Sequence, residues 1–339
     1  IGSGLVGSEM CIRDRYKEMS VDNNHGGSKS KEELIEEINR LKKEREAVIM
    51  AHYYQQGDIQ DIADYIGDSL ALAQIAAKTD AKVIVMCGVH FMGETAKILC
   101  PDKTVLVPDM EAGCSLADSC DAKEFEEFIK EHPNHTVISY VNTTAAVKAL
   151  TDIVVTSGNA RKIVESLDKD EKIIFGPDKN LGGYINSVSG RNMVLWNGAC
   201  HVHEQFSLEK IKELKKEHPE ALVLVHPECK KPLQLIADKI GSTAVLLDFA
   251  GKSDAKEFIV ATESGILHEM QKKYPDKLFI PAPPNDSSCA CNECSYMKLN
   301  TLQKVRDALA NMSPAIEVDA VVAERARKPI ERMLEITAK

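Results

Sequence analysis

Three strand-like runs recur along this chain, about 87 residues apart, and each of them ends in polar side chains. They are VIMAHYY from Val48, TVISYVNT from Thr136 and LVLVHPE from Leu222. A small polar signal (GDS, TSGN or GST) follows each run, and each unit then reaches a cysteine. A long-period repeat of this kind predicts three copies of one α/β unit that converge on a shared site.

Short apolar runs alternate with helical stretches along the body of the chain. Besides the three runs above, strands are predicted at 82–89, 104–107, 153–155, 172–175, 193–195, 244–247, 258–261 and 277–280. Such alternation is typical of parallel sheets that helices cover on both faces. The predicted fold class is therefore α/β, with three similar three-layer αβα domains.

The repeat also predicts domain boundaries. Residues 30–120, 121–206 and 207–298 would form the three units, and 299–339 would form C-terminal helices that pack back on the body. A kink or break is expected at Pro329, since proline cannot donate a helical hydrogen bond. Residues 1–28 show no helical or strand periodicity, and we expect a non-native or disordered extension there. A helix is expected after them, because Ser30 and Glu33 form a capping box.

Each unit is expected to project polar side chains from a strand end, because residues i and i+2 of a strand share one face. The pairs are His52 with Tyr54, Tyr140 with Asn142, and His226 with Glu228. Ligands of open parallel sheets bind beyond these carboxyl ends. Helix starts, where free N–H groups favour anions, are expected at Ser69, Ser157, Ser242 and Thr243. One such anion-binding helix start in each of the three units would suit a substrate that bears phosphate and carboxylates.

One cysteine in each unit follows a strand and precedes a polar or helical segment. These are Cys114, Cys200 and Cys294. Thiolates are the expected ligands of iron–sulfur clusters and also of zinc. Three thiolates would leave one iron of a four-iron cluster open. Cys289 and Cys291 give a C-x-C-x-x-C group with Cys294, which alone is a weak metal signal.

Composition excludes several classes of protein. The net charge is -10, which argues against a nucleic-acid partner. No run of 18 apolar residues occurs, so no membrane span is expected. Ten cysteines without a convincing secretory signal favour thiols or metal ligands in a reducing, cytoplasmic compartment over a disulfide framework.

The chain resembles the quinolinate synthase family from about Leu34 to its C-terminus. The resemblance is carried jointly by AHYYQ, GDSLALA, GVHFMGETAKIL, LVPDMEAGCSLAD, YVNTTAAVKA, VVTSGNA, GPDKNLG, WNGACHVHE, VHPEC, GST and CSYMKLNTL. It implies three α/β domains around a pseudo-threefold axis and a central [4Fe-4S] cluster held by Cys114, Cys200 and Cys294. Some relatives carry C-x-x-C-x-x-C near the third ligand, which puts a redox role of Cys289 and Cys291 in doubt.

The resemblance also implies an activity: iminoaspartate condenses with dihydroxyacetone phosphate, giving quinolinate, phosphate and water on the route to NAD. An L-aspartate oxidase would supply the imine. Residues implied to line the cavity are His52, Tyr54, Ser69, Tyr140, Asn142, Ser157, His203, His226, Glu228, Ser242 and Thr243. Glu228 is our choice for the catalytic base, and His226, His203 and Tyr54 would join the proton transfers.

Two other functions share the same cysteines. An aconitase-type hydro-lyase would use an open iron but need no phosphate corner. A non-catalytic iron or zinc protein would sense oxygen or metal. A phosphate requirement in the substrate separates the first from a quinolinate synthase, and a colourless purified protein would argue for zinc.

Overall fold

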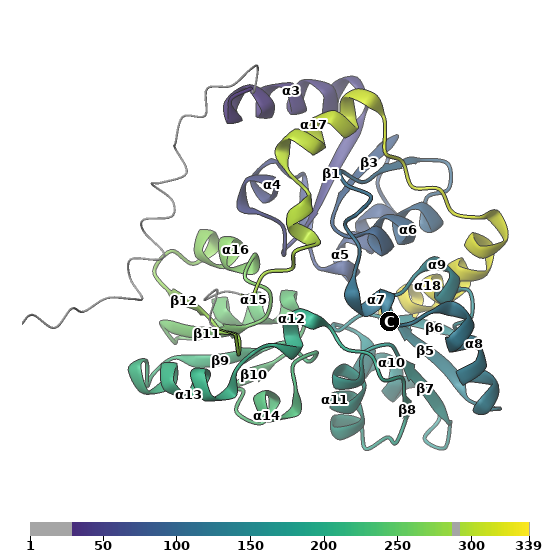
Figure 1. Ribbon diagram of the computed structural model, residues 1–339, viewed down its shortest axis with the longest axis vertical. Helices are drawn as coiled ribbons and strands as arrows, with labels where there is room; N and C mark the ends of the chain where they lie inside the picture. Colours follow the sequence, from purple (N-terminus) through teal and green to yellow (C-terminus); the bar gives the residue numbers. More distant parts are fainter. Residues whose placement is uncertain (1–28, 287–291, 339) are drawn as a thin grey trace, which may run out of the picture.

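Strands form three separate four-stranded parallel sheets in the computed structural model, which describes residues 29–286 and 292–338 (Figure 1). The first sheet has the order β2 (Tyr65–Gly67), β1 (Ala47–His52), β3 (Val83–Cys87), β4 (Thr104–Leu106). The second has β6 (Ile153–Val155), β5 (Thr136–Tyr140), β7 (Ile173–Gly176), β8 (Val194–Leu195). The third has β10 (Lys239–Ile240), β9 (Leu222–Val225), β11 (Glu257–Ala261), β12 (Leu278–Pro281). The common strand order confirms the predicted α/β class.

Helices accompany each sheet. With the first are α3 (Lys31–Glu44), α4 (Gly57–Ile62), α5 (Ser69–Ala76), α6 (His90–Leu99) and α7 (Ser115–Asp118). With the second are α8 (Ala122–Glu131), α9 (Ala145–Lys148), α10 (Ala160–Ser166), α11 (Lys179–Ser189) and α12 (His201–Glu204). With the third are α13 (Leu208–Glu217), α14 (Lys231–Gln234), α15 (Thr243–Lys252), α16 (Ile266–Lys273) and the 3-10 turn η1 (Met297–Leu299). The chain ends in α17 (Leu302–Asn311) and α18 (Ala320–Ala338).

One side-chain contact recurs at the same point of every sheet. A backbone N–H of the central strand donates to an aspartate 15 residues later, which directly precedes the edge strand. The pairs are Ile49 with Asp64 at 2.8 Å, Val137 with Asp152 at 2.7 Å and Val223 with Asp238 at 2.7 Å. This detail supports the derivation of the three units from one ancestral pattern.

The apolar runs became strands because both faces of each sheet are covered. Every residue of β3 and of β6 is buried, as continuous Val/Ile runs in parallel sheets require. The predicted capping box is also present, with Ser30 and Glu33 exchanging hydrogen bonds at the start of α3. The three units meet around α7 and α12 in Figure 1.

One predicted strand is wrong. Residues 244–247 lie inside α15, where Ser242 caps the helix by accepting the Val245 N–H at 3.4 Å. Leu246, Leu247 and Ala250 are buried along this helix, so the apolar run has helical rather than strand spacing. Short apolar runs do not separate the two cases by periodicity alone. The edge strands β2 and β10 were missed, since three and two residues carry too little pattern.

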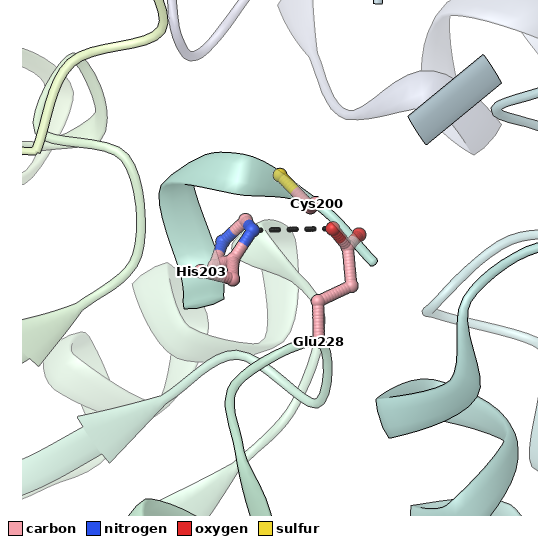
Figure 2. Close-up of side chains that lie close together, drawn as sticks. All are labelled: Cys200, His203 and Glu228. Atoms are coloured by element: carbon pink, nitrogen blue, oxygen red, sulfur yellow. Dashed lines mark ion pairs between the residues drawn. The ribbon is translucent and has the colours of Figure 1, made fainter. Parts of the chain in front are cut away.

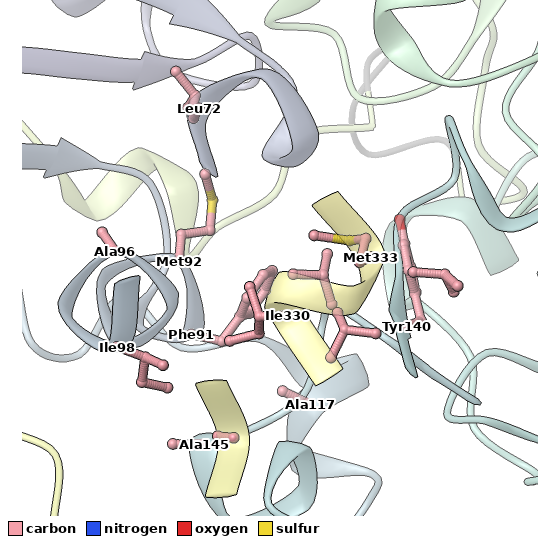
Figure 3. Close-up of a cluster of buried hydrophobic side chains, with 14 of the residues drawn as sticks. Leu72, Phe91, Met92, Ala96, Ile98, Ala117, Tyr140, Ala145, Ile330 and Met333 are labelled. Carbon is pink, nitrogen blue, oxygen red and sulfur yellow. The ribbon is translucent and has the colours of Figure 1, made fainter. Parts of the chain in front are cut away.

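A kink or break was predicted at Pro329, and the break is wrong, since α18 continues through this residue. Helical structure is interrupted instead between α17 and α18, beginning at Met312, which has a φ of 52°. Burial of Ile330 and Met333 offsets the hydrogen bond that proline cannot make. The helix packs against α6 of the first unit and against α9 and β6 of the second. Figure 3 shows both side chains beside Phe91 and Tyr140.

Truncation of Ile330 to alanine should lower the free energy of unfolding by roughly 2–5 kcal/mol, because the fully buried side chain would leave a cavity. Urea denaturation would measure the loss. Glu331→Ala is the matched control, since that neighbouring side chain is 49% exposed. Equal midpoints for the two variants would show that α18 is not part of the core.

The three sheets come from residues 47–106, 136–195 and 222–281. We propose on this basis that the predicted boundaries at 30–120, 121–206, 207–298 and 299–339 delimit the units and the C-terminal helices. Residues 1–28 and the cysteines at 289 and 291 lie outside the described residues. None of the helices described is both long and apolar enough to cross a membrane.

Candidate active site

A cavity lies where β1, β5 and β9 end, with an empty volume of about 710 Å³ when its open mouth is counted. Side chains of all three units line it. Thirteen of the predicted site residues are among them: His52, Tyr54, Ser69, Cys114, Tyr140, Asn142, Ser157, Cys200, His203, His226, Glu228, Thr243 and Cys294. Concave sites where a few polar side chains converge are typical of small-molecule binding proteins.

The helix starts that were predicted to bind anions differ in detail from the helix starts of the structure. Ser69 is the first residue of α5, but the cap is Asp68. Ser157 does not begin a helix, since α10 starts at Ala160. Ser242 does cap α15, yet its buried hydroxyl lies outside the cavity lining. Thr243, the next residue, reaches the cavity instead. The first turns of α5 and α15 therefore provide two helix N-termini at the cavity.

The three predicted metal ligands enter the cavity from three segments. Cys114 directly precedes α7 and Cys200 directly precedes α12, while Cys294 lies three residues before η1. None of them is bridged to another described cysteine. Burial raises the pKa of Cys114 to about 12 and raises the pKa values of Cys200 and Cys294 as well. A metal that binds here must therefore displace thiol protons.

Glu228 is the centre of the polar contacts. The Tyr140 hydroxyl donates to its Oε1 at 2.5 Å, and His203 Nδ1 lies 3.1 Å from Oε2. The His203 and His226 rings stack with centroids 4.6 Å apart. Desolvation opposes ionisation of Glu228, but His203, His226 and Tyr140 hold its pKa below the usual value. The carboxylate is thus ionised at neutral pH.

Tyr54 connects the first unit to the third. Its hydroxyl lies 2.9 Å from Thr243 Oγ1 and 2.7 Å from Thr262 Oγ1. Thr262 in turn lies 3.0 Å from His203 Nε2. Tyr54, Thr262, His203 and Glu228 therefore form a continuous polar chain through the site. Burial raises the pKa of Tyr54 far above its usual value, so the phenol keeps its proton.

The pairs His52/Tyr54 and His226/Glu228 are brought together by turns after the strands, and not by the alternation of side chains along a strand. β1 ends at His52, and the Tyr54 N–H returns to His52 Nδ1 at 3.1 Å. β9 ends before His226, and the Glu228 N–H returns to His226 Nδ1 at 3.4 Å. The same turn therefore orients both imidazoles.

Three buried polar atoms of the cavity lining have no hydrogen-bond partner among the described residues. They are Asn142 Oδ1, Thr156 Oγ1 and His203 Nδ1. The His203 atom is within ion-pair distance of Glu228, but its geometry is not that of a hydrogen bond. Unsatisfied buried groups cost free energy, so all three atoms are available to a ligand.

Several lining residues were missed by the sequence prediction. Ser115 Oγ lies 2.6 Å from His201 Nδ1, which joins the segments of the first two cysteines. The Tyr296 ring packs edge-on to His201 at 6.0 Å. All three follow a predicted ligand within two residues, and that proximity was the available signal. Thr262 offered none, since it is one more buried residue after a strand.

One trio of donors is close enough for a single ion. Cys200, His203 and Glu228 bring sulfur, nitrogen and oxygen atoms within 4.8 Å of one another (Figure 2). Such mixed donors suit zinc. The trio includes one of the three cysteines, so a single ion and a cluster would compete for Cys200.

Acidification should destabilise the fold through His52 and His226. Burial lowers the pKa of each to about 3, whereas both bind a proton near pH 6.5 when unfolded. The unfolded chain therefore binds more protons below pH 6.5, and stability falls as the pH drops. From pH 6.5 to pH 5 we expect a loss of about 2 kcal/mol per histidine. Urea unfolding at both pH values should show a smaller loss for His226→Gln than for the parent; identical losses would contradict this.

The fold and the cavity define a class: triplicated α/β proteins in which three units share one polar, thiol-lined site. The family model of the quinolinate synthetase A protein matches residues 36–335. The chain belongs to this family.

Relatives agree with this membership over nearly the whole chain. The quinolinate synthase of Synechocystis sp. is 59% identical over 302 residues, which are 89% of this chain and 95% of the relative. That of Chloroherpeton thalassium is 57% identical over 305 residues, 90% of this chain and 95% of the relative. That of Trichodesmium erythraeum is 56% identical over 306 residues, 90% and 94% respectively.

Proposed function

We propose that this chain is an enzyme that condenses iminoaspartate with dihydroxyacetone phosphate to quinolinate, with release of phosphate and water. Family membership supports the activity. The observation that carries it at the level of the site is the shared cavity, where three thiols and the Glu228 network come from three repeated units. The relatives do not favour a hydro-lyase or a metal sensor.

The donor set fits a [4Fe-4S] cluster held by Cys114, Cys200 and Cys294. One thiol arrives from each unit, and thiolates are the usual ligands of such clusters. The unpaired atoms of Asn142 and His203 beside them fit a polar ligand. With three protein ligands, the cluster would supply Lewis acidity at its fourth iron.

The substrates bring carboxylates and a phosphate into a cavity that has few cations of its own. Thr243 and Ser69, at the starts of α15 and α5, would bind anionic groups with the help of free N–H groups. Ser157 would contribute a hydroxyl, and Asn142 and Tyr140 would bind carboxylate or carbonyl oxygens. Ser242, outside the lining, would act only by capping α15.

Proton transfer would centre on Glu228. Its ionised carboxylate would accept a proton from the triose carbon. Tyr140 and His203 would stabilise the carboxyl group of Glu228 before and after it takes up this proton. Thr262 connects His203 with the protonated Tyr54 phenol. That chain would return a proton to the leaving hydroxyl. His52 and His226 are neutral near pH 7 and would orient the substrates.

Anaerobic reconstitution with iron and sulfide tests the proposal. The reconstituted protein should turn brown and form quinolinate from the two substrates. Substrate lacking the phosphate should not react. A reconstituted protein that binds a cluster but forms no quinolinate would contradict the proposed activity.

The cellular setting is proposed on the same basis. A cytoplasmic location suits seven described cysteines that are not paired. The imine substrate hydrolyses readily, which favours functional coupling to an L-aspartate oxidase that produces it.

A further inference from the structure

One backbone hydrogen bond holds each cysteine segment to its own unit. The donor is the third residue after a strand, and the acceptor carbonyl lies two residues before the cysteine. The pairs are His90 with Ala112 at 2.7 Å, Lys179 with Gly198 at 2.9 Å and Ser264 with Asn292 at 3.2 Å. The three units therefore present Cys114, Cys200 and Cys294 through equivalent local structure.

The residue before each donor differs among the units. Asp178 precedes Lys179, and its Oδ2 accepts the Cys200 N–H at 3.3 Å. Glu263 precedes Ser264, and its Oε1 accepts the Cys294 N–H at 3.1 Å. In the first unit the equivalent residue is Val89, whose side chain accepts no hydrogen bond. Cys200 and Cys294 are thus the two cysteines whose own N–H is accepted by a buried carboxylate of the same unit, whereas the Cys114 segment is joined to the Cys200 segment through Ser115 and His201.

Both carboxylates are completely buried, at 0% exposure. Asp178 also caps α11, accepting the Leu181 N–H at 2.7 Å. Glu263 accepts the Gly265 N–H at 2.7 Å and pairs with Lys298 at 2.9 Å. Lys298 donates to the Tyr54 carbonyl at 2.8 Å, so this network reaches the first unit.

Burying a carboxylate is costly unless it is well hydrogen-bonded. Asp178 and Glu263 are buried at equivalent positions and are both well hydrogen-bonded. Each of them accepts one hydrogen bond from the backbone N–H of a proposed cluster ligand. A cap or an ion pair alone would not require that coincidence. Groups that orient metal ligands are typically worth a factor of 10–100 in metal affinity.

We propose that Asp178 and Glu263 are positioning residues that hold Cys200 and Cys294 in the orientation required for binding the cluster. In this role they act through the two cysteines, and Glu263 is in addition part of the cavity lining. The inference rests on the proposed cluster site and adds to it two carboxylates, with Val89 at the equivalent position beside the Cys114 segment.

The test is cluster retention in the reconstituted protein. Asp178→Asn, Glu263→Gln and Glu263→Leu are compared with the parent by the decay of visible absorption and by the release of iron to an excess of chelator. The control is Glu269→Gln, a buried carboxylate of the third unit, on α16, that pairs with Lys273 and makes no hydrogen bond to Cys114, Cys200 or Cys294. Thermal unfolding of the cluster-free proteins monitors the fold.

We expect both positions to lose iron roughly 10–100-fold faster than the parent, with Glu263→Leu fastest and the control unchanged. The near-isosteric amide variants keep the fold intact, so their iron loss is separable from unfolding. Variants that retain iron as firmly as a cluster-bearing parent would overturn the positioning role alone. A parent that takes up no cluster would overturn the proposed site itself.

Discussion

Replacing Glu228 with glutamine is expected to lower the rate of quinolinate formation by roughly 10²–10⁴-fold, the usual effect of removing a general acid–base group. The amide cannot accept the substrate proton, although it fills the same space between Tyr140 and His203. The measurement is the rate of quinolinate formation after anaerobic reconstitution, with iron content determined in the same samples.

The matched control is Glu204→Gln. Glu204 lies outside the cavity lining and pairs with Lys230 at 3.2 Å. Its replacement should leave the rate unchanged. A Glu228→Gln protein with full cluster content and an unreduced rate would reject Glu228 as the base.

Replacing Cys200 with serine is expected to abolish cluster binding. Only three thiols of the described residues line the cavity, so two would remain. A serine hydroxyl is a far poorer ligand for iron than a thiolate. The reconstituted variant should contain background amounts of iron and sulfide and should lack the brown colour. Quinolinate formation should fall to background with it.

Cys87→Ala provides the comparison. Cys87 is fully buried in β3 and lies outside the cavity lining, so its removal should leave the iron content unchanged. Full iron content in Cys200→Ser would show that this cysteine is not a ligand.

The strands of the sheet interiors were predictable because they are buried on both faces. Residues 258–261 were predicted and lie in the internal strand β11 (Glu257–Ala261). The run at 244–247 failed because an apolar stretch in α15 faces a sheet, and packing alone distinguishes such a helix from a strand. The break predicted at Pro329 is wrong for a related reason. Burial of α18 outweighs the local preference of proline for ending a helix.

The candidate site was predictable to the extent that its residues follow strands. His52, Tyr140 and His226 lie at the ends of three equivalent strands and meet in one cavity. The hydrogen bonds of Thr262 to Tyr54 and His203 were not predictable. Those contacts join residues roughly 60 to 210 positions apart, and no local pattern encodes them.

The amino-acid sequence by itself determined the three α/β units, the strand ends that carry polar groups and one cysteine per unit, because periodicity and repetition are local properties of a chain. Only the tertiary structure decided which of those groups face one another. Docking of the second and third units sets the ionisation of Glu228, and folding within each of these units attaches Cys200 and Cys294 to buried carboxylates. These properties depend on burial and on distances between remote segments, which arise only when the chain folds.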